Sequence, residues 1–161
     1  MKLMLNGAVT LGTYDGANIE IVREAGEENN YIFGASVDEL ERIRPNYSPR
    51  EVYDRDPIVR RAVDALVDGS ISRNDDSVRV FREIYNGLLV GDWRKPDYYF
   101  NLYDLHGYID TKLRAIYDTR DADAFARKCL MNVVSAGKFS SDRTIAQYAE
   151  NIWHIESVEK L

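Results

Sequence analysis

The sequence predicts a predominantly helical α/β fold, and three observations support this. Only two short apolar runs resemble β-strands, at residues 8–11 and 31–33. The segment between them, 16–25, is long enough for a crossover helix, which is the order found in βαβ-type units. After Gly34, apolar residues recur at three- and four-residue steps, which is the spacing of amphipathic helices.

Both predicted strands are short and apolar, which fits buried parallel strands better than a sheet that faces solvent on one side. Two parallel strands do not make a stable sheet on their own. We therefore expect the rest of the sheet to come from residues outside this sequence. The abrupt start at Lys2 is likewise typical of a piece taken from a longer chain.

Capping signals divide the helical part of the chain. Serines followed three residues later by glutamate form capping boxes that open helices at Ser36 and Ser48, the first of them ending near residue 43. Asp56 with the following proline opens a third helix, which Gly69 ends. The remaining helices are expected at 77–90, 97–118, 122–136 and 142–153, with a polar loop at 70–76 and a connector at 92–96.

The apolar positions of each helix predict the face that it buries. Gly107 interrupts the longest helix and is expected to bend it. The predicted faces are Val59, Val63, Leu66 and Val67 in the third helix, Val78, Phe81, Ile84, Tyr85 and Leu88 at 77–90, Leu102, Leu105, Ile109, Leu113 and Ile116 at 97–118, and Ile145, Tyr148, Ala149, Ile152 and Trp153 at 142–153.

Composition is that of a soluble globular protein, with 45% hydrophobic and 30% charged residues. No apolar run approaches the roughly 18–20 residues that span a bilayer, so no membrane partner is expected. A net charge of −6 argues against nucleic acid as a partner. The single cysteine, Cys129, suits a reducing cytoplasmic location, and its apolar helix face predicts a core residue rather than a nucleophile.

Lys2 is the first candidate for chemistry, because Met1, Leu3, Met4 and Leu5 surround it with apolar residues. Apolar surroundings generally lower the pKa of a lysine amine, and only a neutral amine attacks a carbonyl carbon. On composition alone, a charged lysine at a frayed terminus explains these residues better.

The turn at 12–18 is rich in glycine and capping residues. Its backbone amides, at the start of a helix, would attract an anion. A tight strand-to-helix turn capped by Asp15 accounts for the same residues equally well.

Two further pairs of residues have side chains that commonly act as ligands. Lys138 and Arg143 are candidates for holding an anion, although pairing with acidic neighbours is the favoured interpretation. His106 and His154 have no cysteine or carboxylate at metal-ligand spacing, so no metal site is expected.

The first twenty residues also resemble a known family. The run Lys-x-Met-Leu-Asn-Gly-Ala-x-Thr-x-Gly-Thr-x-Asp-Gly-Ala-Asn-x-Glu, at 2–20, is similar to the pyridoxal-phosphate lysine region of the α-glucan phosphorylases, which act on glycogen, starch and maltodextrin. Segments 24–29, 31–34 and 137–149 match the family pattern as well, whereas 45–120 agrees in helical pattern more than in residues.

This resemblance implies an activity and a cofactor. α-Glucan phosphorylases transfer a terminal α-1,4-linked glucosyl unit to inorganic phosphate, giving glucose 1-phosphate. They hold pyridoxal 5'-phosphate as a Schiff base on the lysine that matches Lys2, and the phosphate of the cofactor acts as acid–base partner of the substrate phosphate.

The resemblance also implies an architecture. The family has two Rossmann-like domains of the glycosyltransferase-B type, with the active site between them. The chain is therefore expected to be the carboxyl-terminal part of one such domain. In this interpretation 1–35 is the end of the sheet region with the cofactor lysine, and 36–161 is the helical remainder with a terminal helix at 142–153.

Several parts of the family pattern are absent from this sequence. The Gly-Thr-Gly-Asn run before the lysine region, the basic residues that hold the two phosphates, the residues that grip glucose and the amino-terminal domain with its regulatory sites are missing. No catalytic residue is therefore assigned, and the chain alone is expected to be inactive. The alternative is a non-catalytic helical interaction module derived from a phosphorylase. The incomplete sheet and the apolar last helix predict a homo-oligomer.

Overall fold

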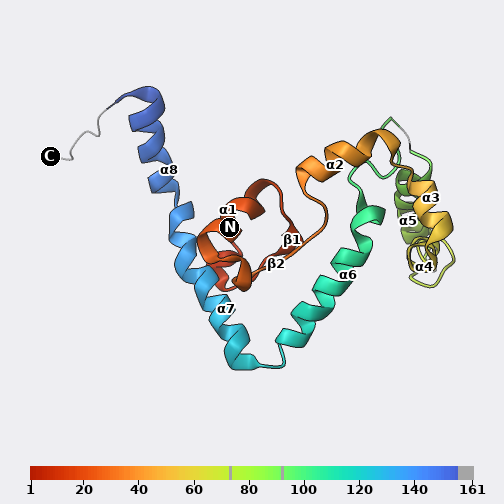
Figure 1. The fold of residues 1–161 in the computed structure, drawn as a ribbon, viewed down its shortest axis with the longest axis horizontal. Helices are drawn as coiled ribbons and strands as arrows, with labels where there is room; N and C mark the ends of the chain where they lie inside the picture. Colours follow the sequence, from red (N-terminus) through yellow and green to blue (C-terminus); the bar gives the residue numbers. More distant parts are fainter. Residues whose placement is uncertain (73, 92, 156–161) are drawn as a thin grey trace. The chain divides into compact units, whose positions relative to one another are not determined.

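The computed structural model of the chain describes residues 1–72, 74–91 and 93–155. Residues 73, 92 and 156–161 lie outside the described residues, so the loop predicted at 70–76 and the connector predicted at 92–96 are each described only in part. The chain divides into two compact units. The first comprises Met1–Ile32 with Thr111–Leu161, and the second is Phe33–Asp110 (Figure 1).

Each unit has its own set of elements, and the boundaries fall within β2 (Tyr31–Phe33) and α6 (Asn101–Asp118). The first unit contains η1 (Met4–Asn6), β1 (Leu11–Thr13), α1 (Gly16–Ala25), η2 (Glu27–Asn29), α7 (Ala122–Ser135), η4 (Ala136–Phe139), α8 (Ser141–Tyr148) and the π-helix η5 (Ala149–Trp153). The second contains α2 (Val37–Ile43), η3 (Arg44–Asn46), α3 (Pro49–Arg55), α4 (Pro57–Asp64) and α5 (Asp75–Leu89).

The predicted α/β class, mostly helical, is confirmed. Strands β1 and β2 form a two-stranded parallel sheet, with α1 as the connection between them. The strand predicted at 8–11 is misplaced, since β1 begins only at Leu11. Pairing starts at Thr10, whose carbonyl accepts the N–H of Tyr31 at 2.8 Å and whose own N–H donates to the Asn30 side chain at 3.2 Å.

The core of the first unit lies where the amino-terminal segment meets α1, α7 and η4. Met4, Ile21, Ala25 and Ala136 form one buried cluster, against which Phe139 packs. This cluster joins residues 4–25 to residue 136, which are far apart in the sequence. Burial of Met4 therefore fixes the residues that directly follow Lys2.

The core of the second unit is built by α4, α5 and α6. Its buried members are Val59, Val63, Leu89 and Leu102. The first two confirm the predicted face of the third helix, although α4 ends at Asp64, before the last two positions of that face. On α5 the buried residue is Leu89 and not the predicted Ile84, which is exposed.

The capping residues predicted for the second unit are confirmed. Ser36 and Ser48 each accept the N–H of the residue three positions later, at 3.3 Å. Asp56 accepts two backbone amides at the start of α4. A capping box would also place the Glu39 carboxylate on the backbone N–H of Ser36. In the structure this carboxylate instead accepts the hydroxyl of Tyr103 at 2.9 Å.

Two predicted helix starts are wrong. α5 begins at Asp75, two residues early, because Asn74 caps it through two backbone amides. α6 begins at Asn101 rather than at Asp97. Asp97 and Phe100 have φ values of 45° and 60°, which lie in the left-handed region and interrupt a helix.

Several predicted core positions are exposed in the structure. On α6, Leu113 and Ile116 are exposed, and on α8 and η5 the same is true of Ile145, Tyr148, Ile152 and Trp153. Gly107 lies inside α6, and a Cβ there would lie 3.5 Å from the backbone N of Gly34, which is an ordinary van der Waals contact. None of the helices among the described residues is both long and apolar enough to cross a membrane.

Candidate functional site

The backbone around Lys2 is held in a compact turn. The amide of Asn6 donates from Nδ2 to the carbonyl of Lys2 at 3.0 Å, and the N–H of Gly7 donates to the carbonyl of Met4 at 3.0 Å. Gly7 adopts a left-handed conformation, with φ of 78°, which ends η1. A non-glycine residue at this position would be strained.

Two contacts attach this turn to the rest of the first unit. Met4 is only 2% exposed and lies in the core with residues of α1 and η4. A Cβ at Gly7 would lie 3.5 Å from the Cβ of Cys129 on α7, so the backbone passes close to that helix. Cys129 is half-buried at this contact, whereas its apolar helix face predicted a core residue.

The side chain of Lys2 is exposed on this fixed backbone. Leu3 and Leu5 are 73% and 59% exposed, so the apolar flanks seen in the sequence do not enclose the amine. Within the described residues, the Lys2 amine makes no hydrogen bond and no ion pair. The structure thus presents a primary amine that is open to an approaching carbonyl group.

The turn between β1 and α1 is closed by a residue that the sequence analysis did not single out. Asn18 donates from Nδ2 to the carbonyl of Thr13 at 2.9 Å, and its N–H donates to the carbonyl of Asp15 at 3.0 Å. The predicted cap is wrong in its detail, because Asp15 occupies the N-cap position without a side-chain hydrogen bond. An asparagine shortly after a Gly-rich turn is a recognisable signal for this role.

The favoured pairing with an acidic neighbour is confirmed for Lys138, whereas Arg143 has structural partners that are not acidic. Lys138 forms an ion pair with Glu24 of α1, and Arg143 donates to the carbonyl of Lys138 and to Gln147. These contacts tie η4 and the start of α8 to the first unit. Both cations therefore serve the fold.

A polar cluster lies beside β2 in the first unit. The hydroxyl of the buried Tyr31 donates to Asp118 at 2.7 Å, and burial together with this carboxylate raises the pKa of Tyr31. Arg114 and Lys128 lie 5.6 Å and 5.5 Å from the centre of the Tyr31 ring, within the range of cation–π attraction. They line a pocket of about 530 Å³ together with Glu27 and Glu28.

One buried side chain near this cluster is incompletely paired. Asn132 is 0% exposed, and its Nδ2 donates to the carbonyls of Asn29 at 2.9 Å and Lys128 at 3.0 Å. Its Oδ1 is buried without a hydrogen-bond partner. The two donated bonds fix the orientation of the amide and join α7 to the segment before β2.

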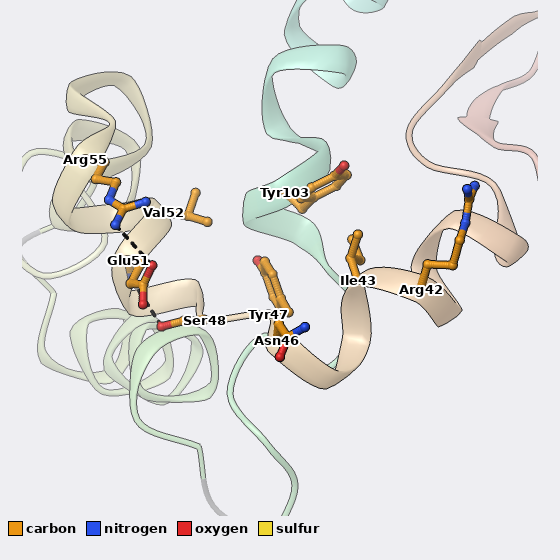
Figure 2. A pocket seen from close by; sticks show the side chains of 9 residues that line it. All are labelled: Arg42, Ile43, Asn46, Tyr47, Ser48, Glu51, Val52, Arg55 and Tyr103. Atoms are coloured by element: carbon orange, nitrogen blue, oxygen red, sulfur yellow. Dashed lines mark hydrogen bonds and ion pairs between the residues drawn. The ribbon is translucent and has the colours of Figure 1, made fainter.

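The second unit has a pocket of about 420 Å³ beside α2 and α3, shown in Figure 2. Tyr47 and Tyr103 face its middle, and their rings meet edge-on with centres 6.2 Å apart. Arg55 pairs with Glu51 at 3.4 Å, and Arg42 donates to a carbonyl one turn earlier. Both arginines of this pocket are therefore engaged, Arg55 with a carboxylate and Arg42 with the backbone.

The two histidines have separate structural partners. His106 lies 2.6 Å from the carboxylate of Asp56, and this contact lowers the pKa of Asp56. His154 contacts the carbonyl of Glu150 at 2.9 Å. Among the residues that the structure describes, no group of three or more His, Cys, Asp or Glu side chains is placed to hold a metal ion.

Comparison with known proteins gives a consistent family. A family model described as carbohydrate phosphorylase matches residues 1–155. The chain is 41% identical to the brain form of glycogen phosphorylase from Mus musculus over 157 residues, which is 97% of this chain and 18% of that protein.

Bacterial relatives show the same coverage. The chain is 39% identical to glycogen phosphorylase from Haemophilus influenzae over 99% of its length and 19% of that protein. It is 43% identical to maltodextrin phosphorylase from Streptococcus pneumoniae over 96% of its length and 20% of that protein. The chain thus spans about a fifth of the length of the curated relatives that it matches.

Proposed function

The chain belongs to the carbohydrate phosphorylase family, and we propose that it is the carboxyl-terminal portion of an α-glucan phosphorylase. The observation that carries this proposal is the match over nearly the whole chain to relatives named glycogen phosphorylase and maltodextrin phosphorylase. The whole protein transfers α-1,4-linked glucosyl units to inorganic phosphate and releases glucose 1-phosphate.

In this proposal the two-stranded sheet is the end of a larger Rossmann-like sheet. The order β1, α1, β2 is that of a parallel α/β unit, and strands of this kind are buried on both faces in complete domains. The region 1–35 contributes this sheet end, and 36–161 contributes the helical remainder. The terminal helix, proposed at 142–153, corresponds to α8 and η5.

We further propose that Lys2 holds pyridoxal 5'-phosphate as a Schiff base in the whole protein. The part of the cofactor site that this chain supplies is the lysine that holds the cofactor covalently. Lys2 offers an exposed primary amine that has no partner among the described residues, and buried Met4 with left-handed Gly7 holds its backbone in place. When bound, the cofactor supplies a phosphate group as a proton donor and acceptor beside the substrate phosphate.

The chain by itself is proposed to lack phosphorylase activity. Phosphoryl and glucosyl groups are held by preorganised charges and hydrogen-bond donors on several elements. Among the described residues, no cluster of cations is directed toward Lys2. The two candidate cations, Lys138 and Arg143, are engaged in contacts that hold the fold. A cytoplasmic location and self-association through the exposed apolar faces of α6 and α8 belong to the same proposal.

The test uses the natural protein that carries these 161 residues. Lys2→Arg keeps the positive charge but removes the amine that forms a Schiff base. We expect this variant to lose phosphate-dependent release of glucose 1-phosphate from glycogen or maltodextrin. Lys138→Arg, which keeps the charge opposite Glu24, is the matched control and retains the activity.

Two results would contradict the proposal. Full phosphorolysis by the Lys2→Arg protein would show that Lys2 is not the tether. Release of glucose 1-phosphate by the purified 161-residue chain would show that this chain contains a complete active site.

A further inference from the structure

A second pocket in the Phe33–Asp110 unit combines cations with exposed aromatic rings. Its volume is about 750 Å³, within the range of small-molecule sites. Arg44 of η3 lies on one side, and the loop before α6 supplies Trp93, Lys95, Tyr98 and Tyr99. Trp93 and Tyr99 are 78% and 66% exposed, which is unusual for such large rings.

The loop that carries these rings is anchored at its carboxyl end. The N–H of Asp97 donates to the carbonyl of Gly87 at 2.9 Å, and the Asp97 carboxylate accepts the backbone amides of Asn101 and Leu102. Tyr47 donates to the same carboxylate at 2.6 Å. These bonds stabilise the left-handed conformation of Asp97, so the wall of the pocket is preorganised.

Two guanidinium groups approach one ring in this wall. The Cζ atoms of Arg44 and Arg94 each lie 5.4 Å from the centre of the Tyr98 ring. Arg44 also lies 4.7 Å from the Phe100 ring, and Arg94 lies 3.9 Å from the Trp93 ring. The aromatic faces therefore position both cations at the pocket.

The acidic group among the described lining residues of the pocket is already engaged. Asp97 is the carboxylate among the lining residues that the structure describes, and its oxygens already accept bonds from Tyr47, Asn101 and Leu102. Arg44 forms no ion pair within the described part of the chain. Arg44 and Lys95 thus bring positive charge to this pocket in a chain whose net charge is −6.

From these contacts we infer that this pocket binds a small phosphate ester. A planar guanidinium matches phosphate oxygens in a bidentate manner, which suits Arg44, and Lys95 adds a second charge. The exposed ring of Trp93 offers an apolar surface for the organic part of the ester. The pocket in Figure 2 differs, since its arginines are engaged by Glu51 and a backbone carbonyl.

The test measures binding to the 161-residue chain by titration calorimetry at low ionic strength. The probes are glucose 1-phosphate, inorganic phosphate and glucose, the first chosen because it is the product of the proposed function. We expect glucose 1-phosphate to bind more tightly than inorganic phosphate, glucose not to bind, and added salt to weaken binding.

Four substitutions locate the site. Arg44→Gln is expected to weaken binding of glucose 1-phosphate about tenfold or more, because a charge-assisted hydrogen bond is lost. Lys95→Gln repeats the test at an exposed position outside the core, in case the first variant fails to fold by circular dichroism. Arg42→Gln, in the pocket of Figure 2, is the matched control with unchanged affinity. Trp93→Ala is expected to weaken the binding of glucose 1-phosphate more than the binding of inorganic phosphate.

The inference is overturned if neither phosphate compound binds, if glucose binds as tightly as its phosphate, or if the Arg44 and Lys95 variants bind like the unchanged chain. If Trp93→Ala weakens the binding of glucose 1-phosphate and of inorganic phosphate equally, the ring does not contact the organic part of the ester. Phosphorolysis by the whole protein does not enter this measurement, so failure here leaves the proposed function to its own test.

Discussion

Met4→Ala tests how the segment that carries Lys2 is held. Met4 is 2% exposed and packs in one cluster with Ile21, Ala25 and Ala136. Truncation to alanine removes the three heavy atoms beyond Cβ. At about 0.8 kcal/mol for each methylene-sized group, plus the cavity that remains, the free energy of unfolding falls by about 2–3 kcal/mol.

The loss is expected to be concentrated in the amino-terminal segment. The N–H groups of Gly7 and Ala8 donate to the carbonyls of Met4 and Leu3, at 3.0 Å and 3.1 Å. Both bonds depend on the turn that Met4 anchors, so their amides exchange with solvent roughly a hundredfold faster in the variant. Hydrogen exchange read by NMR measures this residue by residue, and urea unfolding gives the global free energy.

Leu5→Ala is the matched control, because Leu5 is in the same turn but 59% exposed. Its effect on the free energy of unfolding should stay within about 0.5 kcal/mol. If Met4→Ala and Leu5→Ala destabilise the chain equally, or if the amides of Gly7 and Ala8 keep their protection, the anchoring role of Met4 is wrong.

Two further substitutions test a half-buried carboxylate and a buried amide, each by thermal or urea unfolding. Burial raises the pKa of Asp104, whose carboxylate accepts the N–H of Ala35 at 2.9 Å. A carboxyl with a raised pKa in the folded state binds its proton more tightly there than in the unfolded chain, so it opposes folding above that pKa. Asp104→Asn keeps the acceptor without the charge and should raise the melting temperature at pH 7, with the gain disappearing as the pH falls toward the unfolded pKa of about 3.9. Asp110→Asn, at an exposed position on the same helix, is the control and should leave the melting temperature at pH 7 nearly unchanged. A loss of stability in Asp104→Asn at pH 7 would contradict the reasoning. Asn132→Asp replaces two donated hydrogen bonds by a buried charge facing two carbonyl oxygens, so it should cost more than about 3 kcal/mol at pH 7. Asn151→Asp, at an exposed position, is nearly neutral, and similar unfolding curves for these two variants would show that Asn132 is not buried as described.

Local signals in the sequence predicted much of the fold. Serine capping boxes located the starts of α2 and α3, and the segment Gly16–Ala25 was predicted as a helix with the bounds that the structure shows. The start of α6 was not predictable in this way. Asp97 resembles an ordinary helix-opening residue, whereas its left-handed conformation depends on Gly87 and Tyr47, which are distant in sequence.

Apolar periodicity identified helices better than it identified the core. Leu113 and Ile116 continue the pattern of α6 yet are exposed, because the pattern marks an apolar face and does not say what covers it. The same limit applies to the candidate site. The apolar residues around Lys2 were compatible with an enclosed amine, although a charged lysine at a frayed terminus explained them better. In the structure Leu3 and Leu5 are exposed and Met4 is buried, so the sequence pattern did not show which of these flanks pack.

The proposal for Lys2 can be tested on the intact natural protein by reduction of its cofactor linkage. Borohydride converts a Schiff base into a stable secondary amine, and mass spectrometry of the peptides then identifies the modified lysine. We predict a phosphopyridoxyl group on the peptide that contains Lys2, and none on Lys138. A reduced cofactor on another lysine, with Lys2 unmodified, would show that the amine at the start of this chain does not hold vitamin B6.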